Sequence, residues 1–260
     1  MKYVDEFRDP VRAGVLLKEI EALTAQIMAG RDRPVVIMEV CGGHTHSIFR
    51  YGIEKMLPPE IEFAHGPGCP VCVLPMGRVD DCVELAMKPE VIFTTFGDAM
   101  RVPGSRLSLL GAKAEGADVR MVYSPLDALA LARANPDREV VFFGLGFETT
   151  MPSTALTILQ AQAEGIGNFS LFCNHITIIP TIKAILDSPD MGIDGFLGPG
   201  HVSMVIGTDP YDFIARDYHR PLVVAGFEPL DVLHSVWMVL RQMAEGRAEI
   251  KNQYDRIVPR

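Results

Sequence analysis

The 260-residue chain has few cysteines, few aromatic residues and no long apolar run. Five cysteines are an odd and sparse set, which excludes a disulfide framework and predicts free thiols unless they bind metal or do redox work. No apolar run approaches the roughly 20 residues that cross a bilayer. The first residues, MKYVDEFRDP, carry charges where a signal peptide needs apolar side chains. We therefore expect a cytoplasmic protein.

Positive charge is also scarce. The chain holds 24 basic and 33 acidic residues, a formal net charge of -9. Such a balance provides no basic surface for phosphate backbones or anionic lipids, so we expect neither nucleic acid nor membrane as a partner. The phosphate-binding patterns GxxxxGK[ST] and GxGxxG are absent from the sequence, and nucleotide binding is not predicted.

Short apolar runs alternate with amphipathic stretches, which is typical of βαβ units in a parallel sheet. The predicted strands are 34–40, 61–65, 91–96, 119–123, 139–145, 168–173, 194–197 and 221–225. The predicted helices are 11–29, 45–56, 77–87, 105–115, 125–134, 150–164, 178–187 and 229–245. We predict an α/β fold of two Rossmann-like parallel-sheet halves. A seam at YSPLD (123–127) separates an N-terminal α/β domain (1–123), which carries the cysteine motifs, from a second one (124–260) with a C-terminal helix.

Six motif-like segments directly follow predicted strands: CGGHTH (41–46), HGPGCPVC (65–72), FGDAMRVPG (96–104), GFETTMP (146–152), NHITIIP (174–180) and GPGHVS (198–203). In parallel sheets such loops share the carboxyl edge of the strands, where open α/β folds bind ligands. We therefore expect these loops to converge on one cleft at the carboxyl ends of the strands.

Cys41 lies between a predicted strand and a predicted helix. Amide N–H groups and the helix dipole at that position lower a thiol pKa, which favours a thiolate. Gly42 and Gly43 lack Cβ atoms and let a bulky ligand approach the backbone, while His44 and His46 add imidazoles for metal ligation or proton transfer. The alternative is a tight turn with an incidental cysteine.

Cys69 and Cys72 form a CxxC pair in a loop rich in glycine and proline. This spacing allows a reversible disulfide or two ligands to a soft metal. A closed zinc site would need Cys41 or a histidine as additional ligands, because no second CxxC exists in the sequence.

The remaining motifs contribute the polar residues Asp98, Glu148, His175 and His201. These side chains can act as hydrogen-bond partners, proton carriers or supports for a metal-bound group. A structural role is the alternative for each of them. Asp98 with Arg101 would form an ion pair at a helix start, and Glu148 at a helix start would be favoured by the dipole alone.

Taken together, the motifs resemble the HypD family of [NiFe]-hydrogenase maturation factors from about residue 11 onward. The matching segments are MEVCGGHTH, HGPGCPVC, TTFGDAMRVPGS, VYSPLDAL, FFGLGFETTMPSTA, DGFLGPGHVS and VVAGFEPLDVL. The resemblance implies a scaffold for assembly of an iron centre, Fe(CN)2CO. It also implies a small chaperone partner, HypC, a cyanide donor, HypE, and the hydrogenase large subunit as an indirect recipient.

The resemblance also implies residue roles. Cys41 would be the iron ligand, alongside a cysteine of the small partner and with His44 close by. Cys69 and Cys72 would be a redox-active pair. Three further residues match polar positions of the family's motifs: Asp98, Glu148 and His201. The implied protein is a metal-centre assembly scaffold with redox-active thiols rather than a conventional turnover enzyme.

The family continues into a cysteine-rich segment that binds a [4Fe–4S] cluster, whereas this sequence stops at Arg260 and retains no four-cysteine set for such a cluster. Two other function classes remain open. One is a thiol–disulfide oxidoreductase that uses Cys69 and Cys72 with Cys41 as a third thiol. The other is a zinc-dependent hydrolase with these three cysteines, a histidine, and Glu148 as base.

Overall fold

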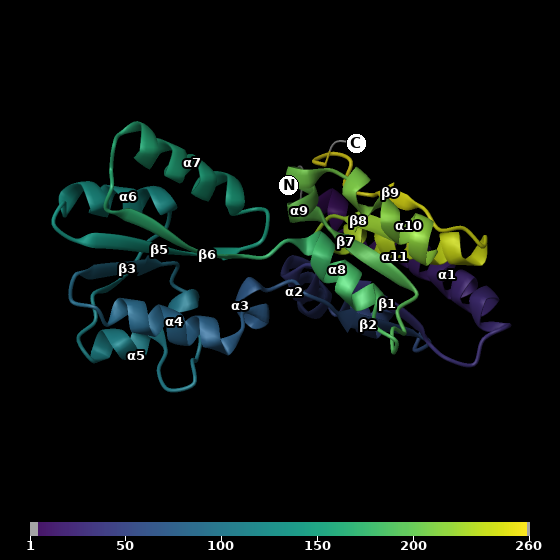
Figure 1. Ribbon diagram of the computed structural model, residues 1–260. Helices are drawn as coiled ribbons and strands as arrows, with labels where there is room; N and C mark the ends of the chain where they lie inside the picture. The colour runs from purple at the N-terminus through teal and green to yellow at the C-terminus, as the bar shows by residue number, and fades with distance from the viewer. Residues whose placement is uncertain (1–4, 259–260) are drawn as a thin grey trace. The chain divides into compact units, whose positions relative to one another are not determined.

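The computed structural model of the protein describes residues 5–258. The chain divides into two compact units (Figure 1). Unit 1 comprises Met1–Gly68 and Ile178–Arg260, and unit 2 comprises Cys69–Thr177. Unit 1 is therefore built from two separate stretches of sequence, with unit 2 inserted between them.

Unit 1 contains a five-stranded parallel sheet in the order β2-β1-β7-β8-β9. Its strands are β1 (Val35–Glu39), β2 (Ile61–His65), β7 (Gly195–Pro199), β8 (Leu222–Ala225) and β9 (Ile250–Asn252). Its helices are η1 (Asp5–Phe7), α1 (Pro10–Met28), α2 (Gly42–Tyr51), η2 (Ile53–Met56), α8 (Ile178–Leu186), α9 (Gly200–Ile206), η4 (Asp209–Tyr211), α10 (Asp212–Tyr218) and α11 (Pro229–Ala244). The carboxyl ends of β1 and β2 are in register, since Glu39 pairs with His65.

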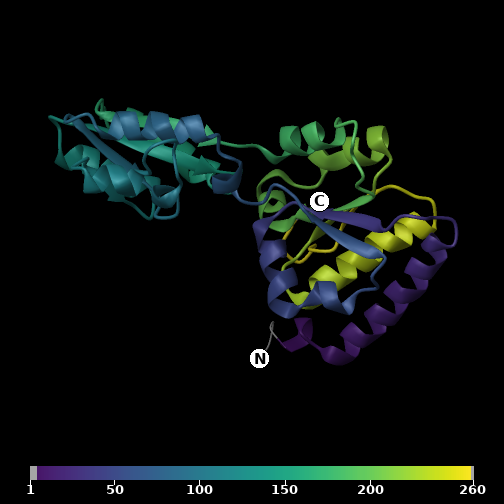
Figure 2. The ribbon, with the colours of Figure 1, turned by 90° about the horizontal axis from the view of Figure 1, so that it is seen from below.

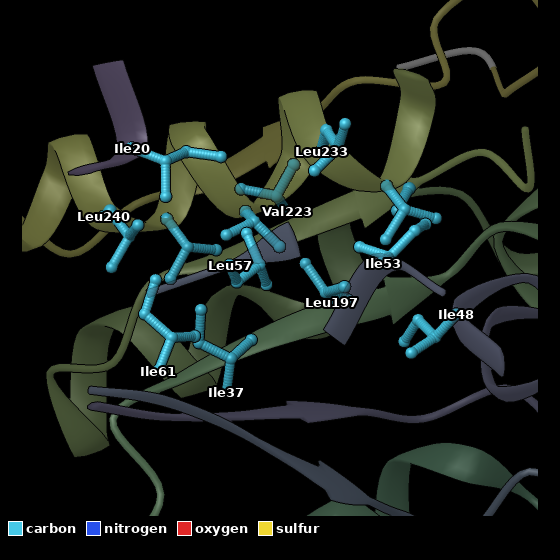
Figure 3. Packing of buried hydrophobic residues seen from close by; sticks show 14 of the residues in the cluster. Ile20, Ile37, Ile48, Ile53, Leu57, Ile61, Leu197, Val223, Leu233 and Leu240 are labelled. Carbon is cyan, nitrogen blue, oxygen red and sulfur yellow. The ribbon is translucent and has the colours of Figure 1, made fainter. Parts of the chain in front are cut away.

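Helices α1 and α11 lie side by side against one face of this sheet (Figure 2). Asp9 begins α1 by accepting a hydrogen bond from the amide of Val11, and Pro10 occupies the first helical position, where its missing N–H costs nothing. Apolar side chains of both helices and of the sheet form one buried cluster (Figure 3), which includes Ile20, Ile37, Leu197, Val223, Leu233 and Leu240. Removing this apolar surface from water stabilises the unit by about 25 cal/mol per Å² buried.

Unit 2 contains a four-stranded parallel sheet in the order β4-β3-β5-β6. Its strands are β3 (Val91–Thr95), β4 (Val119–Met121), β5 (Glu139–Gly146) and β6 (Phe169–His175). Its helices are α3 (Pro70–Val73), α4 (Met76–Ala86), η3 (Ala99–Arg101), α5 (Leu109–Ala114), α6 (Pro125–Ala134) and α7 (Met151–Ala163). Figure 1 shows α4 and α5 on one face of the sheet and α6 and α7 on the other. The central strand β3 is buried along its whole length, as expected when helices cover both faces.

Each unit contains an aspartate held by two arginines. In unit 1, Arg31 and Arg33 bind Asp194, whose side chain is only 4% exposed. Burial alone would raise the pKa of Asp194, but hydrogen bonds from Arg31, the amide of Val36 and Arg33 outweigh it, and the net pKa is lowered. The corresponding ion pairs in unit 2 involve Asp118, as described next.

Asp118 accepts hydrogen bonds from Arg120 at 2.7 Å and from Arg138 at 2.6 Å, with 29% of its side chain exposed. The hydrogen bond from Arg120, followed by that from Arg138, lowers the pKa of Asp118 to about 2. Unit 2 therefore has a more exposed version of the ion-paired aspartate in unit 1.

The predicted fold class is confirmed, since both sheets are parallel and flanked by helices. The division of the chain differs from the predicted one. The boundary predicted between residues 123 and 124 lies inside unit 2, between β4 and α6. The physical reason is strand pairing: β3 lies before that boundary and β5 after it, yet they are hydrogen-bonded neighbours in one sheet.

All eight predicted strands are present, with small shifts at their ends. The strand β9 and the short helices α3, α9 and α10 were not predicted. Helix α9 begins at Gly200, inside the segment GPGHVS, which was predicted to be a loop. Within the described residues, no helix has the length and apolar character needed to cross a membrane.

Candidate functional site

Cys41 is the N-cap residue of α2 and has an extended backbone, φ -156° and ψ 125°. The amides of Gly43 and His44 favour the thiolate, as the sequence predicted, although the thiol makes no capping hydrogen bond. The expected lowering of the thiol pKa is nevertheless wrong. Burial has the larger effect, and with the nearby charge of Glu39 it raises the pKa of Cys41.

The glycines around Cys41 allow two loops to approach each other. The amide of Gly42 donates to the carbonyl oxygen of Gly68 at 3.3 Å. A Cβ atom on Gly68 would lie 2.2 Å from the nitrogen of Gly42, and one on Gly43 would lie 2.7 Å from the ring of Phe227. The approach of a ligand to Gly42 and Gly43 stays a prediction, and the neighbours that an added Cβ atom would meet there are Gly68 and Phe227.

Glu39, at the end of β1, is a fully buried carboxylate. It accepts hydrogen bonds from the amide of Cys41 at 3.0 Å, from Nδ1 of His65 at 2.9 Å and from the hydroxyl of Thr45. Burial raises the pKa of Glu39, and the hydrogen bonds from Thr45, Cys41 and His65 partly offset this. One buried acidic group thus connects the end of β1, the first turn of α2 and the end of β2.

His44 is fully buried, and its Nε2 lies 3.0 Å from the carbonyl oxygen of Ala225. Because a carbonyl oxygen can only accept, Nε2 carries the proton and Nδ1 presents a lone pair. Among the described residues, Nδ1 has no hydrogen-bond partner. Burial lowers the pKa of His44 to about 4, so its imidazole is neutral near pH 7. His46, the other histidine of the motif, is exposed.

Phe227 follows β8 and is stacked between two imidazoles. Its ring centroid lies 4.7 Å from that of His44 and 3.9 Å from that of His201, with interplanar angles of 22° and 20°. The carbonyl oxygen of Phe227 accepts a hydrogen bond from the hydroxyl of Ser47 at 2.5 Å. Burial lowers the pKa of His201. The motifs CGGHTH and GPGHVS therefore meet through a phenylalanine that neither of them contains.

Asp231, near the start of α11, fixes the loop that carries Phe227. Its buried carboxylate accepts hydrogen bonds from both terminal nitrogens of Arg256, at 2.9 and 2.6 Å, and from the side-chain amide of Gln253 at 2.8 Å. Gln253 in turn accepts a bond from the amide of Gly226 at 3.0 Å. The segment that follows β9 therefore holds the residues around Phe227 in place.

Cys69 and Cys72 lie in unit 2, and both are free thiols. Cys69 is the N-cap residue of α3, and its sulfur accepts a hydrogen bond from the amide of Cys72 at 3.3 Å. Cys72 is exposed to solvent. The hydrogen bond with Cys69, together with some desolvation, raises the pKa of the Cys72 thiol.

The other predicted residues of unit 2 have separate positions. Asp98 accepts a hydrogen bond from the amide of Ala99 at the start of η3, which is a capping role. Glu148 is buried just after β5. Nδ1 of His175 lies 3.5 Å from the sulfur of Cys173, and burial lowers the pKa of this histidine.

The structure thus groups the predicted residues by unit. Unit 1 brings together Cys41, Gly42, Gly43, His44 and His201, whereas unit 2 holds Cys69, Cys72, Asp98 and Glu148. Sequence reasoning missed Glu39, His65 and Phe227. A signal existed for Glu39, since it is the one charged residue in the apolar strand VVIME, but nothing in the sequence identified the packing of Phe227.

Within residues 5–258, no group of three or more histidine, cysteine, aspartate or glutamate side chains is arranged to hold a metal ion. An iron–sulfur cluster normally needs four thiolates, so the described residues do not fit the [4Fe–4S] cluster that the resemblance implies for the longer proteins. An iron atom bound at Cys41 would need further ligands from outside the described side chains.

The sequence model of a family described as "HypD: Hydrogenase formation hypA family" matches residues 13–260. The chain belongs to the HypD family. The HypD hydrogenase maturation factor of Rhodobacter capsulatus is 70% identical over 259 residues, which are 100% of this chain and 69% of that protein. The HypD factor of Escherichia coli (strain K12) is 61% identical over 259 residues, with the same coverage of 100% and 69%.

A solved conserved domain protein from Vibrio cholerae aligns over 85% of this chain and 89% of its own, with 12% identity and a TM-score of 0.18. That score is too low to support an argument about the fold. The family assignment therefore rests on the HypD relatives, which match the chain over its full length at high identity.

Proposed function

We propose that this chain is a hydrogenase maturation factor, in which Cys41 holds iron while cyanide and carbon monoxide ligands are added to form Fe(CN)2CO. Membership of the HypD family supports this role, because its relatives of 70% and 61% identity are hydrogenase maturation factors. The observation that carries the proposal is the position of Cys41. It begins α2 three residues before the buried, neutral imidazole of His44, within the matched residues 13–260.

The environment of Cys41 is suited to a soft metal ion. Thiolate is a soft ligand that suits iron in a low-spin, cyanide-rich state. Burial raises the pKa of Cys41, so the thiol is protonated when no metal is bound, and iron binding displaces that proton. His44 adds a neutral, buried imidazole to the first turn of α2, and its Nδ1 has no hydrogen-bond partner among the described residues.

The iron centre is cargo that passes through the scaffold. A cysteine of a HypC-like small chaperone would complete the ligand set with Cys41, a HypE-like protein would donate cyanide, and the hydrogenase large subunit would receive the centre. The exposed Cys72 and its neighbour Cys69 would supply reducing equivalents, since two thiols give up two electrons and two protons when they form a disulfide. Asp98, Glu148 and His201 would support bound ligands through hydrogen bonds or proton transfer.

A thiol–disulfide oxidoreductase is the second candidate. The observation that favours it is the contact between Cys69 and Cys72, in which the sulfur of one residue faces the amide of the other at a helix start. Solvent exposure of Cys72 makes mixed-disulfide exchange with a partner thiol sterically feasible. A zinc-dependent hydrolase lacks a comparable observation, since the described residues contain no three-membered ligand group.

Infrared spectroscopy tests the scaffold role. The chain is co-produced anaerobically with a HypC-like chaperone and the cyanide-donating proteins, and the spectrum is searched for cyanide and carbonyl stretches. We expect these bands in the unmodified protein, none in Cys41→Ala, and unchanged bands in Cys173→Ala, which removes an exposed thiol elsewhere. Bands that persist in Cys41→Ala would contradict iron binding at this residue. A protein without bands or bound iron, but with a reversible Cys69–Cys72 disulfide, would favour the oxidoreductase.

A further inference from the structure

Glu39 is an unusual residue for the end of a central strand. Its side chain is 0% exposed, and within the described residues no lysine or arginine forms an ion pair with it. A buried carboxylate without such a partner is costly unless hydrogen bonds compensate it. Three donors from three places in unit 1 do so: the amide of Cys41, the hydroxyl of Thr45 and Nδ1 of His65.

The contact with Cys41 changes how α2 begins. In a capping box, the side chain of the third helical residue reaches back to the amide of the N-cap residue. Here Cys41 is the N-cap and His44 is the third helical residue. The amide of Cys41 is bound by Glu39 from the preceding strand, and His44 is bound to the carbonyl oxygen of Ala225. Glu39 therefore takes the place that the side chain of His44 would occupy in an ordinary capping box.

The carboxylate is itself held rigidly. Thr45 binds the oxygen that also accepts from His65, and Cys41 binds the other oxygen. The backbone carbonyl of Glu39 accepts a further bond from the amide of Gly66 at 2.8 Å. His65 extends from β2 with 34% of its side chain exposed, and its ring contacts that of Phe49 at 5.1 Å between centroids. Glu39 thus fixes the turn around Cys41 relative to both β1 and β2.

We propose that Glu39 is the positioning residue of Cys41: by binding the amide of Cys41 it fixes the first turn of α2, from which the thiol extends. This inference rests on the proposed function of Cys41 as a metal ligand. Residues that orient metal ligands through hydrogen bonds typically change metal affinity by about 10–100-fold when they are replaced.

Anaerobic titration with Co²⁺ alone tests this proposal, because a cysteine thiolate bound to Co²⁺ gives a charge-transfer absorption band. Since the free thiols of Cys69 and Cys72 could give the same band, the reference protein and every variant carry Cys69→Ser and Cys72→Ser. Glu39→Met preserves the size of the side chain but cannot accept the three hydrogen bonds. We expect about tenfold weaker Co²⁺ binding and a weaker thiolate band at saturation. Glu39→Gln keeps one amide oxygen for Cys41, and we expect it to restore most of the affinity and of the band. Glu62→Gln, which removes an exposed carboxylate from β2, is the matched control and should bind like the reference protein.

The outcomes separate the two proposals. If Cys41→Ser has the same band as the reference protein that lacks the Cys69 and Cys72 thiols, the metal site at Cys41 is wrong. If Cys41→Ser loses the band but Glu39→Met retains full affinity and intensity, the positioning role of Glu39 is wrong. Equal losses in Glu39→Gln and Glu39→Met would also contradict it, because they would indicate a role for charge and not for the hydrogen bond. Should Glu39→Met fail to fold by circular dichroism, Thr45→Val removes one donor to the same carboxylate and is expected to weaken Co²⁺ binding by about tenfold, the low end of the usual range.

Discussion

The turns that carry Cys41 and Cys69 have the same local structure but different surroundings. Cys41 and Cys69 are both N-cap residues of helices that follow a parallel strand. Around Cys41, a buried carboxylate, a buried imidazole and closely packed glycines fix the turn. Around Cys69, the helix α3 has only four residues and the second thiol, Cys72, is exposed. The comparison teaches that the same local position is enclosed by buried groups in one unit and lies beside an exposed thiol in the other.

The largest expected effect on stability concerns the contact between Gly68 and Gly42, next to Cys41. Gly68→Ala places a Cβ atom 2.2 Å from the nitrogen of Gly42, and only backbone movement can relieve that contact. We expect a loss of about 3 kcal/mol in the free energy of unfolding, measured by denaturant titration. Gly30→Ala is the control, since no atom lies within 4 Å of its added Cβ. An unchanged stability of Gly68→Ala would contradict the tight packing of Gly68 against the turn around Cys41.

The ion-paired aspartates Asp194 and Asp118 allow the stability of the two units to be compared. Asp194→Asn leaves two arginines without their buried partner, and we expect it to cost about 3 kcal/mol in unfolding free energy at pH 7. Asp118→Asn removes a more exposed partner and should cost about 1 kcal/mol. Chemical denaturation of both variants measures the difference, and equal costs would contradict the argument from burial.

Asp118, the ion-paired aspartate of unit 2, predicts that the free energy of unfolding depends on pH. Its folded pKa of about 2 lies below the unfolded value of about 4, so its contribution to stability is fully present above pH 4. The contribution declines as the pH falls through the folded pKa. The stability difference between the unmodified protein and Asp118→Asn should therefore shrink between about pH 4 and pH 2. A difference that stays constant over this range would contradict the lowered pKa.

Thiol labelling compares the two turns directly. Reaction with N-ethylmaleimide, followed by mass spectrometry of peptides, should modify Cys72 about tenfold faster than Cys41 at pH 8, because Cys72 is exposed whereas Cys41 is partly buried and desolvation raises its pKa. Cys82 provides the slow reference, since burial raises its pKa to about 12. Labelling of Cys41 as fast as that of Cys72 would remove the proposed distinction between a holding and an exchanging thiol.

The smallest expected effects come from two glycines at the same position of two helices. Gly43 and Gly77 are each the second residue of a helix, α2 and α4. Gly43→Ala pushes against the ring of Phe227 at 2.7 Å and should cost about 1 kcal/mol. Gly77→Ala meets no atom within 4 Å and should stabilise the protein by about 0.5 kcal/mol. Thermal unfolding measures both, and a neutral Gly43→Ala would show that Phe227 moves freely.

Much of the fold could be predicted from residue patterns. Helix α6 spans 125–134 as predicted, because Ser124 and Asp127 form a capping box and Pro125 begins the first turn. The strands were found because apolar, β-branched runs are bounded by polar or glycine-rich segments. The short helix α10 and the strand β9 carry too few residues for a period to be recognised.

The candidate site was predicted in part. Cys41, His44 and His201 were identified because unusual residues directly after strands stand out in the sequence. Their meeting through Phe227 was not predicted, since stacking depends on where β7 and β8 lie relative to β1. The pKa of Cys41 was predicted in the wrong direction because local amides are visible in a sequence, whereas burial is not.

The sequence by itself determined the elements, the parallel α/β class and the motifs that relate the chain to the HypD family, because these depend on residues close together in the chain. Only the tertiary structure decided that β1 pairs with β7 across an inserted unit, and that Glu39 and Phe227 complete the surroundings of Cys41 and His44. Strand pairing and burial depend on contacts between residues far apart in sequence, and no local pattern specifies which distant partner a strand or a side chain finds.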